Sequence, residues 1–320
     1  MNDEERDRSG DGAGPSQSDD SGPYIRKSHF CFAYITLIFL SFFAGSVAMA
    51  QEGKGLSVTF DAGVLRPSND QANFYRGIPT NLNTVERVLH SEAYGYPMWV
   101  ELTDMDLITS AISNYNQLQV EEYGNMSYRI AVQLGLGFRY GLSHNWAWHL
   151  RFDYAQLEAI GQFLLASGRN NAGMLTNQDA YVACPISGAE KRINIDFSIS
   201  KSFPLVGYYN LELALGASLN NAKVVANDIM VGNSVYNILD VWNGQSPSAY
   251  VQQYDYINQG GIGYGGFGTI GVNLELPSAN AVSIYYSLYY TRIALADYNA
   301  FAPQHLFGLR FELGNFSFIG

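Results

Sequence analysis

The chain has 320 residues, a formal net charge of −11 and only 15% charged side chains, while Tyr, Phe and Gly are abundant. The aromatic content excludes a disordered chain, and the negative charge argues against a nucleic-acid partner, because phosphate contacts need clustered Lys and Arg. Two cysteines cannot build a disulfide framework or a thiolate metal site. The classes that remain are a secreted β protein and a membrane β-barrel.

The first fifty residues follow the order of a secretory signal. Arg26-Lys27 precede an apolar run from Phe30 to Ala44, and Ala48-Met49-Ala50 supply the small residues that a signal peptidase requires. We expect residues 1–50 to be an N-terminal extension and signal peptide that is cleaved, and residues 51–320 to fold. The alternative is an uncleaved anchor helix, since 29–50 is just long enough to cross a bilayer.

The rest of the chain alternates apolar and polar residues with period two, which is typical of strands with two different faces. The clearest segment carries apolar residues at every even position from Tyr128 to Tyr140. That run exceeds the ~9–11 tilted residues that cross a bilayer. After Leu157 the apolar side chains move to odd positions, which predicts a β-bulge. With 128–140, strands are predicted at 55–66, 146–165, 191–203, 208–222, 261–276, 281–294 and 304–316.

The connections between these eight segments alternate in length. Short polar turns follow the second, fourth and sixth strands at 141–145, 204–207 and 277–280. Long connections follow the odd strands at 67–125, 166–190, 223–260 and 295–303. An outer-membrane barrel has this alternation, with tight periplasmic turns and long extracellular loops. A Greek-key sandwich gives no reason for it.

The hydropathy and loop rhythm over about 55–316 resemble the eight-stranded bacterial outer-membrane barrels, the class of the OmpA transmembrane domain and OmpX. The last strand, Gly308-Leu-Arg-Phe311-Glu-Leu313, partly looks like the signal by which such proteins are recognised for assembly. The resemblance implies an all-β, antiparallel, up-and-down transmembrane barrel in the bacterial outer membrane. It also implies outer-membrane lipid and the barrel-assembly machinery as partners.

The inward face of the predicted strands carries five Arg and six carboxylates. Charges removed from water need partners, and eight strands enclose a space that side chains nearly fill. We therefore predict a polar plug, with a small porin-like diffusion channel through the same residues as the alternative. The predicted luminal charge network is Asp61, Arg129, Arg139, Arg151, Asp153, Arg192, Asp196, Glu212, Glu275, Arg310 and Glu312.

Catalysis would need a nucleophile beside a histidine that a third group orients. The sequence places no nucleophile beside His90, His144, His149 or His305, and it holds no metal-ligand motif. The Gly-rich run 260–268 opens a strand with no helix after it, unlike a phosphate loop. We therefore expect no enzyme, no cofactor and no metal, and a barrel-type lipid-modifying enzyme or protease ranks third among the functions.

The long loops carry the features that point to a surface role. In the first loop, Leu82, Val85 and Leu89 recur at helical spacing, as do apolar residues from Met105 to Tyr115 after an Asp104 cap. Acidic residues dominate this loop, which disfavours polyanionic partners. We predict a structural or surface-interaction barrel that presents loops to a carbohydrate or protein. The candidate recognition aromatics, which could instead pack the loops together, are Tyr75, Tyr94, Tyr96, Trp99, Trp242 and Tyr254.

Overall fold

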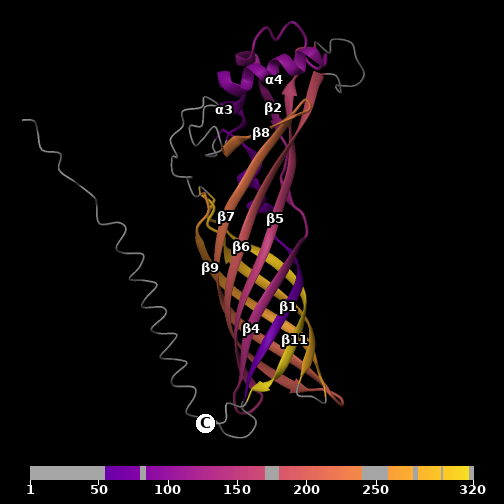
Figure 1. The fold of residues 1–320 in the computed structure, drawn as a ribbon, viewed down its shortest axis with the longest axis vertical. Coiled ribbons are helices and arrows are strands. Elements are labelled where there is room, and N and C mark those ends of the chain that lie inside the picture. Colours follow the sequence, from indigo (N-terminus) through magenta and orange to yellow (C-terminus); the bar gives the residue numbers. More distant parts are fainter. Residues whose placement is uncertain are drawn as a thin grey trace, which may run out of the picture. The chain divides into compact units, whose positions relative to one another are not determined.

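The computed structural model describes residues 55–79, 84–169, 180–239, 259–276, 280–296 and 298–316 (Figure 1). The predicted signal peptide over 1–50 lies outside these ranges, as do Leu82, Trp242 and Tyr254, and those interpretations stay predictions. Within the described ranges no helix has both the length and the apolar character needed to span a membrane.

Eight long strands form a closed antiparallel ring (Figure 1). Each strand pairs with the next one along the chain, and β1 pairs with both β4 and β11. Closure leaves no edge strand and satisfies the backbone hydrogen bonds that lipid cannot satisfy. The predicted eight-stranded barrel is therefore confirmed. Its strands are β1 (Leu56–Arg66), β4 (Ala131–Gly141), β5 (Trp146–Ala166), β6 (Tyr181–Pro204), β7 (Tyr209–Val231), β9 (Ile262–Glu275), β10 (Ala281–Arg292) and β11 (Phe301–Phe316).

Three strands are much longer than the others. β5, β6 and β7 have 21, 24 and 23 residues, against 11 in β1 and β4. They continue past the rest of the ring toward the helices (Figure 1). The predicted loop 166–190 is therefore mostly strand from Tyr181 onward, and β8 (Ser234–Asn237) pairs back on β7 within the predicted loop 223–260. The sequence pattern misses these extensions because large apolar residues on their outer faces, such as Tyr181, Val225 and Met230, are few and do not recur at every second position.

The strand β5 shows why the extensions differ from the ring below them. Its pairing with β6 runs without a register shift from Trp146↔Lys201 to Ala166↔Tyr181, so the bulge predicted at Leu157 is wrong. Odd-numbered residues of β5 face inward along its whole length. What changes at Leu157 is the environment on the two faces of the strand. The inward side chains change from polar to apolar there, and the outward side chains change from apolar to polar.

Below that point the barrel is polar inside and apolar outside. Arg151 and Asp153 face inward there, while Phe152 and Tyr154 are exposed on the outer wall. Above it the arrangement is that of a water-soluble protein, with Leu157 and other apolar residues inside and polar residues outside. The lower part therefore suits lipid and the upper part suits water.

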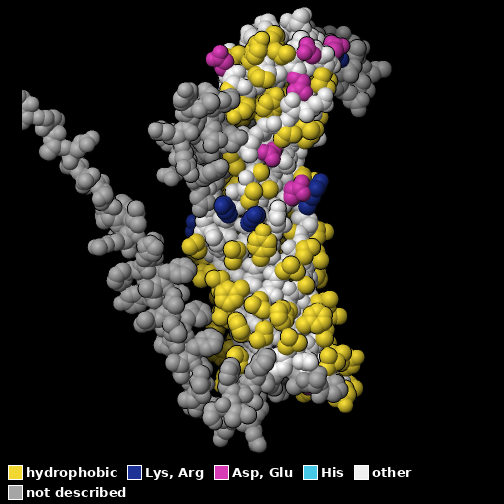
Figure 2. Space-filling view, in the orientation of Figure 1, with side chains coloured by type: hydrophobic (Ala, Val, Ile, Leu, Met, Phe, Trp, Pro, Cys, Tyr) yellow, Lys and Arg dark blue, Asp and Glu magenta, His cyan; other side chains and the backbone are white. Residues whose placement is uncertain are grey.

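A band of exposed apolar side chains covers the lower wall of the barrel (Figure 2). Its members alternate with the inward residues on every strand, as membrane barrels require. Aromatic side chains lie toward both ends of the band, with Tyr264 and Tyr290 contacting Phe301 at one end and Trp146 at the other. The band includes Phe60, Val64, Val132, Leu134, Leu136, Ile193, Ile195, Phe197, Leu213, Leu215, Ile270, Ile284, Leu288, Phe307, Leu309 and Phe311.

The first long connection is partly helical, as predicted. Its elements are α2 (Asn69–Ala72), η1 (Asn73–Arg76), α3 (Val85–Leu89), α4 (Glu92–Asp104), η2 (Tyr115–Gln117), β2 (Val120–Tyr123) and β3 (Ser127–Tyr128). Thr84 and Ser91 cap α3 and α4 through side-chain oxygens that accept backbone N–H groups.

The helix expected after Asp104 is wrong, because Asp104 ends α4 instead of starting a helix. The sequence hides α4 because it contains Gly95 and Pro97, two residues that usually interrupt helices. Gly95 is required by the close approach of α4 to α3, since a Cβ there would lie 1.8 Å from the carbonyl oxygen of Leu89.

We call the part of the protein above the lipid-facing band the head; it comprises the first connection and the extensions of β5–β7 with β8. Apolar side chains from the helices pack onto inward residues of the long strands in one buried cluster. The head is thus a packed unit with its own core. That core includes Val88, Leu89, Met98, Leu102, Ile108, Ile112, Leu118, Phe163, Leu165, Ile186, Ile229 and Val231.

Candidate functional site

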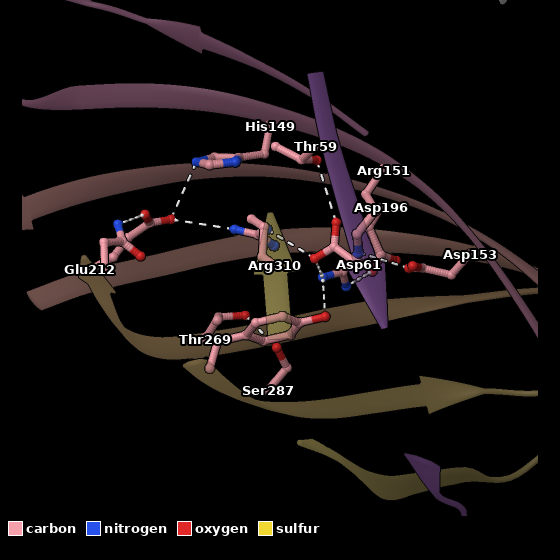
Figure 3. Close-up of polar contacts among 12 residues, drawn as sticks. Thr59, Asp61, His149, Arg151, Asp153, Asp196, Glu212, Thr269, Ser287 and Arg310 are labelled. Atoms are coloured by element: carbon pink, nitrogen blue, oxygen red, sulfur yellow. Dashed lines mark hydrogen bonds and ion pairs between the residues drawn. The ribbon is translucent and has the colours of Figure 1, made fainter. Parts of the chain in front are cut away.

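The lumen holds two layers of buried charge, and Arg151 is the centre of the lower one. Its guanidinium contacts Asp153 at 2.8 Å, Asp196 at 2.6 Å and Asp61 at 3.7 Å (Figure 3). These carboxylates come from β5, β6 and β1, and Arg151 also donates to the Tyr289 hydroxyl of β10, so the cluster reaches across the lumen. We call it the Arg151 layer. Three carboxylates around one arginine leave an excess of negative charge, which a second arginine offsets.

That second arginine is Arg310 of β11. It contacts Asp61 at 2.9 Å and Glu212 at 3.7 Å. The ring of Tyr285 lies beneath both guanidinium groups, 4.9 Å from Arg310 and 5.7 Å from Arg151. Stacking of arginine on an aromatic face adds to ion pairing in a poorly hydrated site. The layer is therefore a network in which each charge has at least one partner of opposite sign.

His149 sits at the edge of this layer with a serine and a glutamate nearby, a combination that resembles catalytic chemistry. Its Nε2 lies 3.3 Å from Glu212 (Figure 3) and 2.8 Å from the Ser200 hydroxyl. A catalytic triad uses the two ring nitrogens separately, one for the nucleophile and the other for the carboxylate. Here one nitrogen makes both contacts. The adjoining cavity measures about 10 Å³, close to the volume needed by a single water.

Near the end of the barrel opposite the head the charges are paired but less buried. Arg139 contacts Glu312 at 3.1 Å, and Ser57 donates to the same carboxylate at 2.6 Å. Glu275 lies exposed at the end of β9, where Asn210 donates to it. Glu275 is therefore a rim residue and does not join the buried network, contrary to the sequence prediction.

The upper layer is built around Arg192 and Glu190 of β6, whose side chains approach to 2.5 Å and are almost fully buried. Arg192 also donates to Gln304 of β11 at 2.9 Å and contacts the Tyr128 hydroxyl of β3. Tyr128 in turn donates to Glu190 at 3.2 Å. We call this set, with Tyr75, the Arg192 layer.

Tyr75 brings the first connection into the barrel. It belongs to η1, is fully buried, and donates its hydroxyl to Glu190 at 2.8 Å. A Cβ on Gly188 would lie 2.1 Å from the Tyr75 ring, so this glycine makes room for the ring against β6. Burial, together with the Glu190 carboxylate, raises the pKa of Tyr75 well above its usual value of 10.0. The hydroxyl therefore stays a donor and holds the connection in the mouth of the barrel.

Arg129 is the second predicted luminal residue that the structure places elsewhere. It points outward and contacts Glu158 at 2.9 Å, with side-chain exposures of 60% and 47%. The strand predicted over 128–140 is interrupted at 129–130, between β3 and β4, and this break reverses the alternation. Tyr128, predicted to face outward, consequently faces the lumen.

The four described recognition aromatics mostly serve packing. Tyr75 is buried in the barrel, Tyr94 packs edge-on against Tyr236, and the Trp99 indole donates to the Ile112 carbonyl at 2.9 Å. Tyr96, at 54% exposure, is the one of the four that is largely accessible. The alternative interpretation, that the aromatics pack the loops together, therefore describes three of them.

Sequence reasoning misses most of the Arg192 layer. Glu190 stands two positions before Arg192, so both share one face of a strand, and that spacing could have identified the pair. The predicted strand begins only at 191 and therefore leaves Glu190 outside it. Residues brought from other elements, such as Gln304 and Gln71, have no signal in the sequence. Over the described ranges no three His, Cys, Asp or Glu residues are grouped so that they could hold a metal ion.

The sequence matches no protein-family model and no curated protein. Three solved structures, each 10% identical in sequence to this chain, have a similar fold. Neisserial surface protein A has a TM-score of 0.37, with 82% of this chain and 99% of that chain covered. OprG from Pseudomonas aeruginosa has a TM-score of 0.36, with 81% of this chain and 96% of that chain covered. Ail from Yersinia pestis, in complex with the heparin analogue sucrose octasulfate, has a TM-score of 0.31, with 82% of this chain and 100% of that chain covered.

The molecule's own geometry carries the assignment of fold and location. An even number of antiparallel strands closes into a ring, the outer wall carries an apolar band, the lumen is charged, and the described parts of the long connections lie at the head end. Single-chain barrels with these properties belong to bacterial outer membranes. The chain is an eight-stranded antiparallel β-barrel of the kind found in bacterial outer membranes.

Proposed function

We propose that this protein is a non-conducting outer-membrane barrel that anchors its folded head outside the cell for surface interaction. The observation that carries the proposal is the contact of Tyr75 with Glu190, because a loop residue completes a buried layer across the mouth of the barrel. The head and the membrane segment are therefore joined by buried polar contacts as well as by strands.

Two layers in series favour a closed lumen. An ion crossing the barrel would have to separate the Arg192–Glu190 pair and then the contacts of Arg151 with its three carboxylates. Breaking buried ion pairs is costly. Open aqueous channels are typical of barrels with about 16–18 strands, whereas eight strands leave little space beyond their side chains.

The head suits a neutral or basic ligand. Its first connection carries Glu86, Glu92, Glu101, Asp104 and Asp106, and acidic side chains are visible on the head in Figure 2. Such a surface repels sulfated polymers and favours a carbohydrate without acidic groups or a protein with basic groups. The exposed Tyr96 on α4 offers an aromatic face for either.

We further propose that His149 has a structural role and no catalytic one, because its single contacting nitrogen and the small neighbouring cavity leave no place for a substrate. The test is the His149→Gln variant, which keeps a donor beside Glu212. The variant should keep the barrel's heat-modifiable gel migration. Lipid hydrolysis by the purified variant should equal that of the purified wild-type protein, and both should stay at the background rate.

Conductance in planar bilayers tests the closed lumen directly. The purified barrel should give no steady channels, while an established sixteen-stranded porin in the same lipid serves as the positive control. Steady ohmic openings of the wild-type protein would contradict the proposal and favour the porin-like alternative. Binding of the purified protein to a glycan array, compared with the Tyr96→Ala variant, tests the role of the head.

A further inference from the structure

The apolar band on the barrel wall ends at a row of basic side chains. Arg66 on β1 follows the exposed Val64, and Lys191 on β6 precedes the exposed Ile193. Arg129 and Lys223 lie on the same side of the band. Lys and Arg side chains gather at this level of the wall in Figure 2, where the hydrophobic surface gives way to the head.

Two of these cations oppose each other directly. Lys191 of β6 and Lys223 of β7 are cross-strand partners, and both are exposed on the outer wall. Side chains in such positions have Cβ atoms roughly 4.5–5.5 Å apart, and like charges there destabilise the sheet. Neither lysine side chain makes an ion pair or hydrogen bond with any described residue. Within the described part of the chain, the pair therefore has no counter-charge of the kind that its geometry calls for.

A groove of about 490 Å³ adjoins this pair on the same wall. Its lower edge is formed by Ile130 and Val132, which are strongly exposed at the top of the apolar band. Gln156 lines the groove and is also the cross-strand partner of Lys191, so the groove and the lysine pair are continuous. The remaining polar lining consists of Arg129, Glu158, Ser187 and Asp228.

The chemistry of this wall matches one class of ligand. The apolar band contacts acyl chains, the lysine pair lies at headgroup level where it can bind a phosphate, and the groove offers amide, hydroxyl and carboxylate groups to sugar hydroxyls. Basic side chains at a membrane surface attract anionic headgroups. We propose that the wall formed by β4–β7 at the head boundary binds the phosphorylated sugar headgroup of an outer-leaflet glycolipid, with Lys191 and Lys223 sharing its phosphate.

The test is a binding titration of the full barrel in neutral detergent with diphosphoryl lipid A as the probe. The Lys191→Gln/Lys223→Gln variant should bind roughly thirtyfold more weakly than wild type, and Lys223→Gln alone about fivefold, the losses expected for two and one basic residues at a membrane surface. The matched control is Lys201→Gln, which removes the same charge from the other end of β6, where Lys201 lies over Trp146 and Phe203.

Two further probes identify what is bound. Phosphate-free lipid A should bind wild type as weakly as the double variant binds the diphosphoryl form, and inorganic phosphate should not compete at equal concentration. An unchanged affinity in the double variant, an equal loss in Lys201→Gln, or competition by inorganic phosphate would each overturn the proposal. Heat-modifiable migration confirms that each variant is folded before titration, and the affinity of Lys223→Gln decides the test if the double variant does not fold.

Discussion

Tyr75 and Glu190 lie more than a hundred positions apart in the chain, yet the tyrosine hydroxyl donates to the carboxylate at 2.8 Å inside the barrel. The contact joins the first extracellular connection to the wall strand β6. Both side chains are fully buried, so neither can exchange its partner for water without moving the connection. The mouth of the barrel is thus closed by a loop residue held in a specific place.

Removing the Tyr75 hydroxyl should destabilise the barrel. Tyr75→Phe keeps the ring against Gly188 but deprives Glu190 of a donor, and a hydrogen bond to a charged group contributes about 1.5–3 kcal/mol. Unfolding in urea should show a loss of that size. Tyr96→Phe on the exposed face of α4 is the control and should leave the unfolding free energy unchanged. Equal midpoints for the two variants would contradict the role assigned to the contact.

Truncating Glu190 should cost far more than truncating Glu158. Glu190→Ala leaves Arg192 buried without its carboxylate, for which about 3–5 kcal/mol is typical. Glu158→Ala breaks an exposed pair with Arg129, and such pairs contribute about 0–1 kcal/mol. Urea unfolding of the refolded variants measures both. Similar losses would show that the Arg192 layer is better hydrated than its burial implies.

Gly188→Ala should expel Tyr75 from its place, because the new methyl group would lie inside the ring's contact distance. We expect the segment 67–79 to become sensitive to added protease while the ring of strands persists. Combining Gly188→Ala with Tyr75→Ala should cost less than the sum of the two single losses, since the smaller side chain relieves the clash. Gly266→Ala, where the nearest atom is at 3.4 Å, is the tolerated control.

Conduction should require opening both layers. Arg192→Ala with Glu190→Ala removes the ion pair of the Arg192 layer but leaves the Arg151 layer intact, so it should stay silent in planar bilayers. Arg151→Ala with Asp153→Ala removes one charge of each sign from the centre of the Arg151 layer and should also stay silent alone. The combined variant should conduct. Currents from either partial variant would show that a single layer closes the lumen.

Alkaline pH should release the first connection. The raised pKa of Tyr75 means that its hydroxyl keeps its proton in the docked state at a pH where a solvent-exposed tyrosine has lost it. The docked state therefore keeps its full stability below about pH 10 and loses it progressively as the pH rises above that value. Protease sensitivity of 67–79 should therefore stay constant up to about pH 10 and increase above it. Tyr75→Phe lacks the titrating group and should show a flatter dependence.

The sequence is most informative where lipid imposes the pattern. Segments such as β1 and β10 are predictable to within a few residues because the outward positions there are apolar. The pattern fails where the surroundings change. Leu157 suggests a bulge although the strand runs straight through, because the interior changes from polar to apolar at that level.

Some luminal residues are likewise predictable from the sequence and others are not. Alternation alone correctly places Arg151 and Asp196 inside, whereas it misplaces Arg129 because the break at 129–130 leaves no mark in the composition. Glu190 escapes prediction, and its partners Tyr75 and Tyr128 receive other roles, since nothing local indicates that a loop residue will cross into the barrel. Long-range packing decides such positions, and a single sequence does not display it.

The uninterrupted pairing of β5 with β6 has a mechanical consequence. From the level of Lys191 to Tyr181, the ladder extends roughly 30 Å along the strand, at ~3.3 Å per residue. The pairing of β5 with β6 is continuous over this stretch, so paired strands connect the head to the barrel and no flexible linker separates them. A partner bound to Tyr96 would be held at a fixed stand-off from the lipid surface, and force applied to that partner would pass straight into the barrel wall.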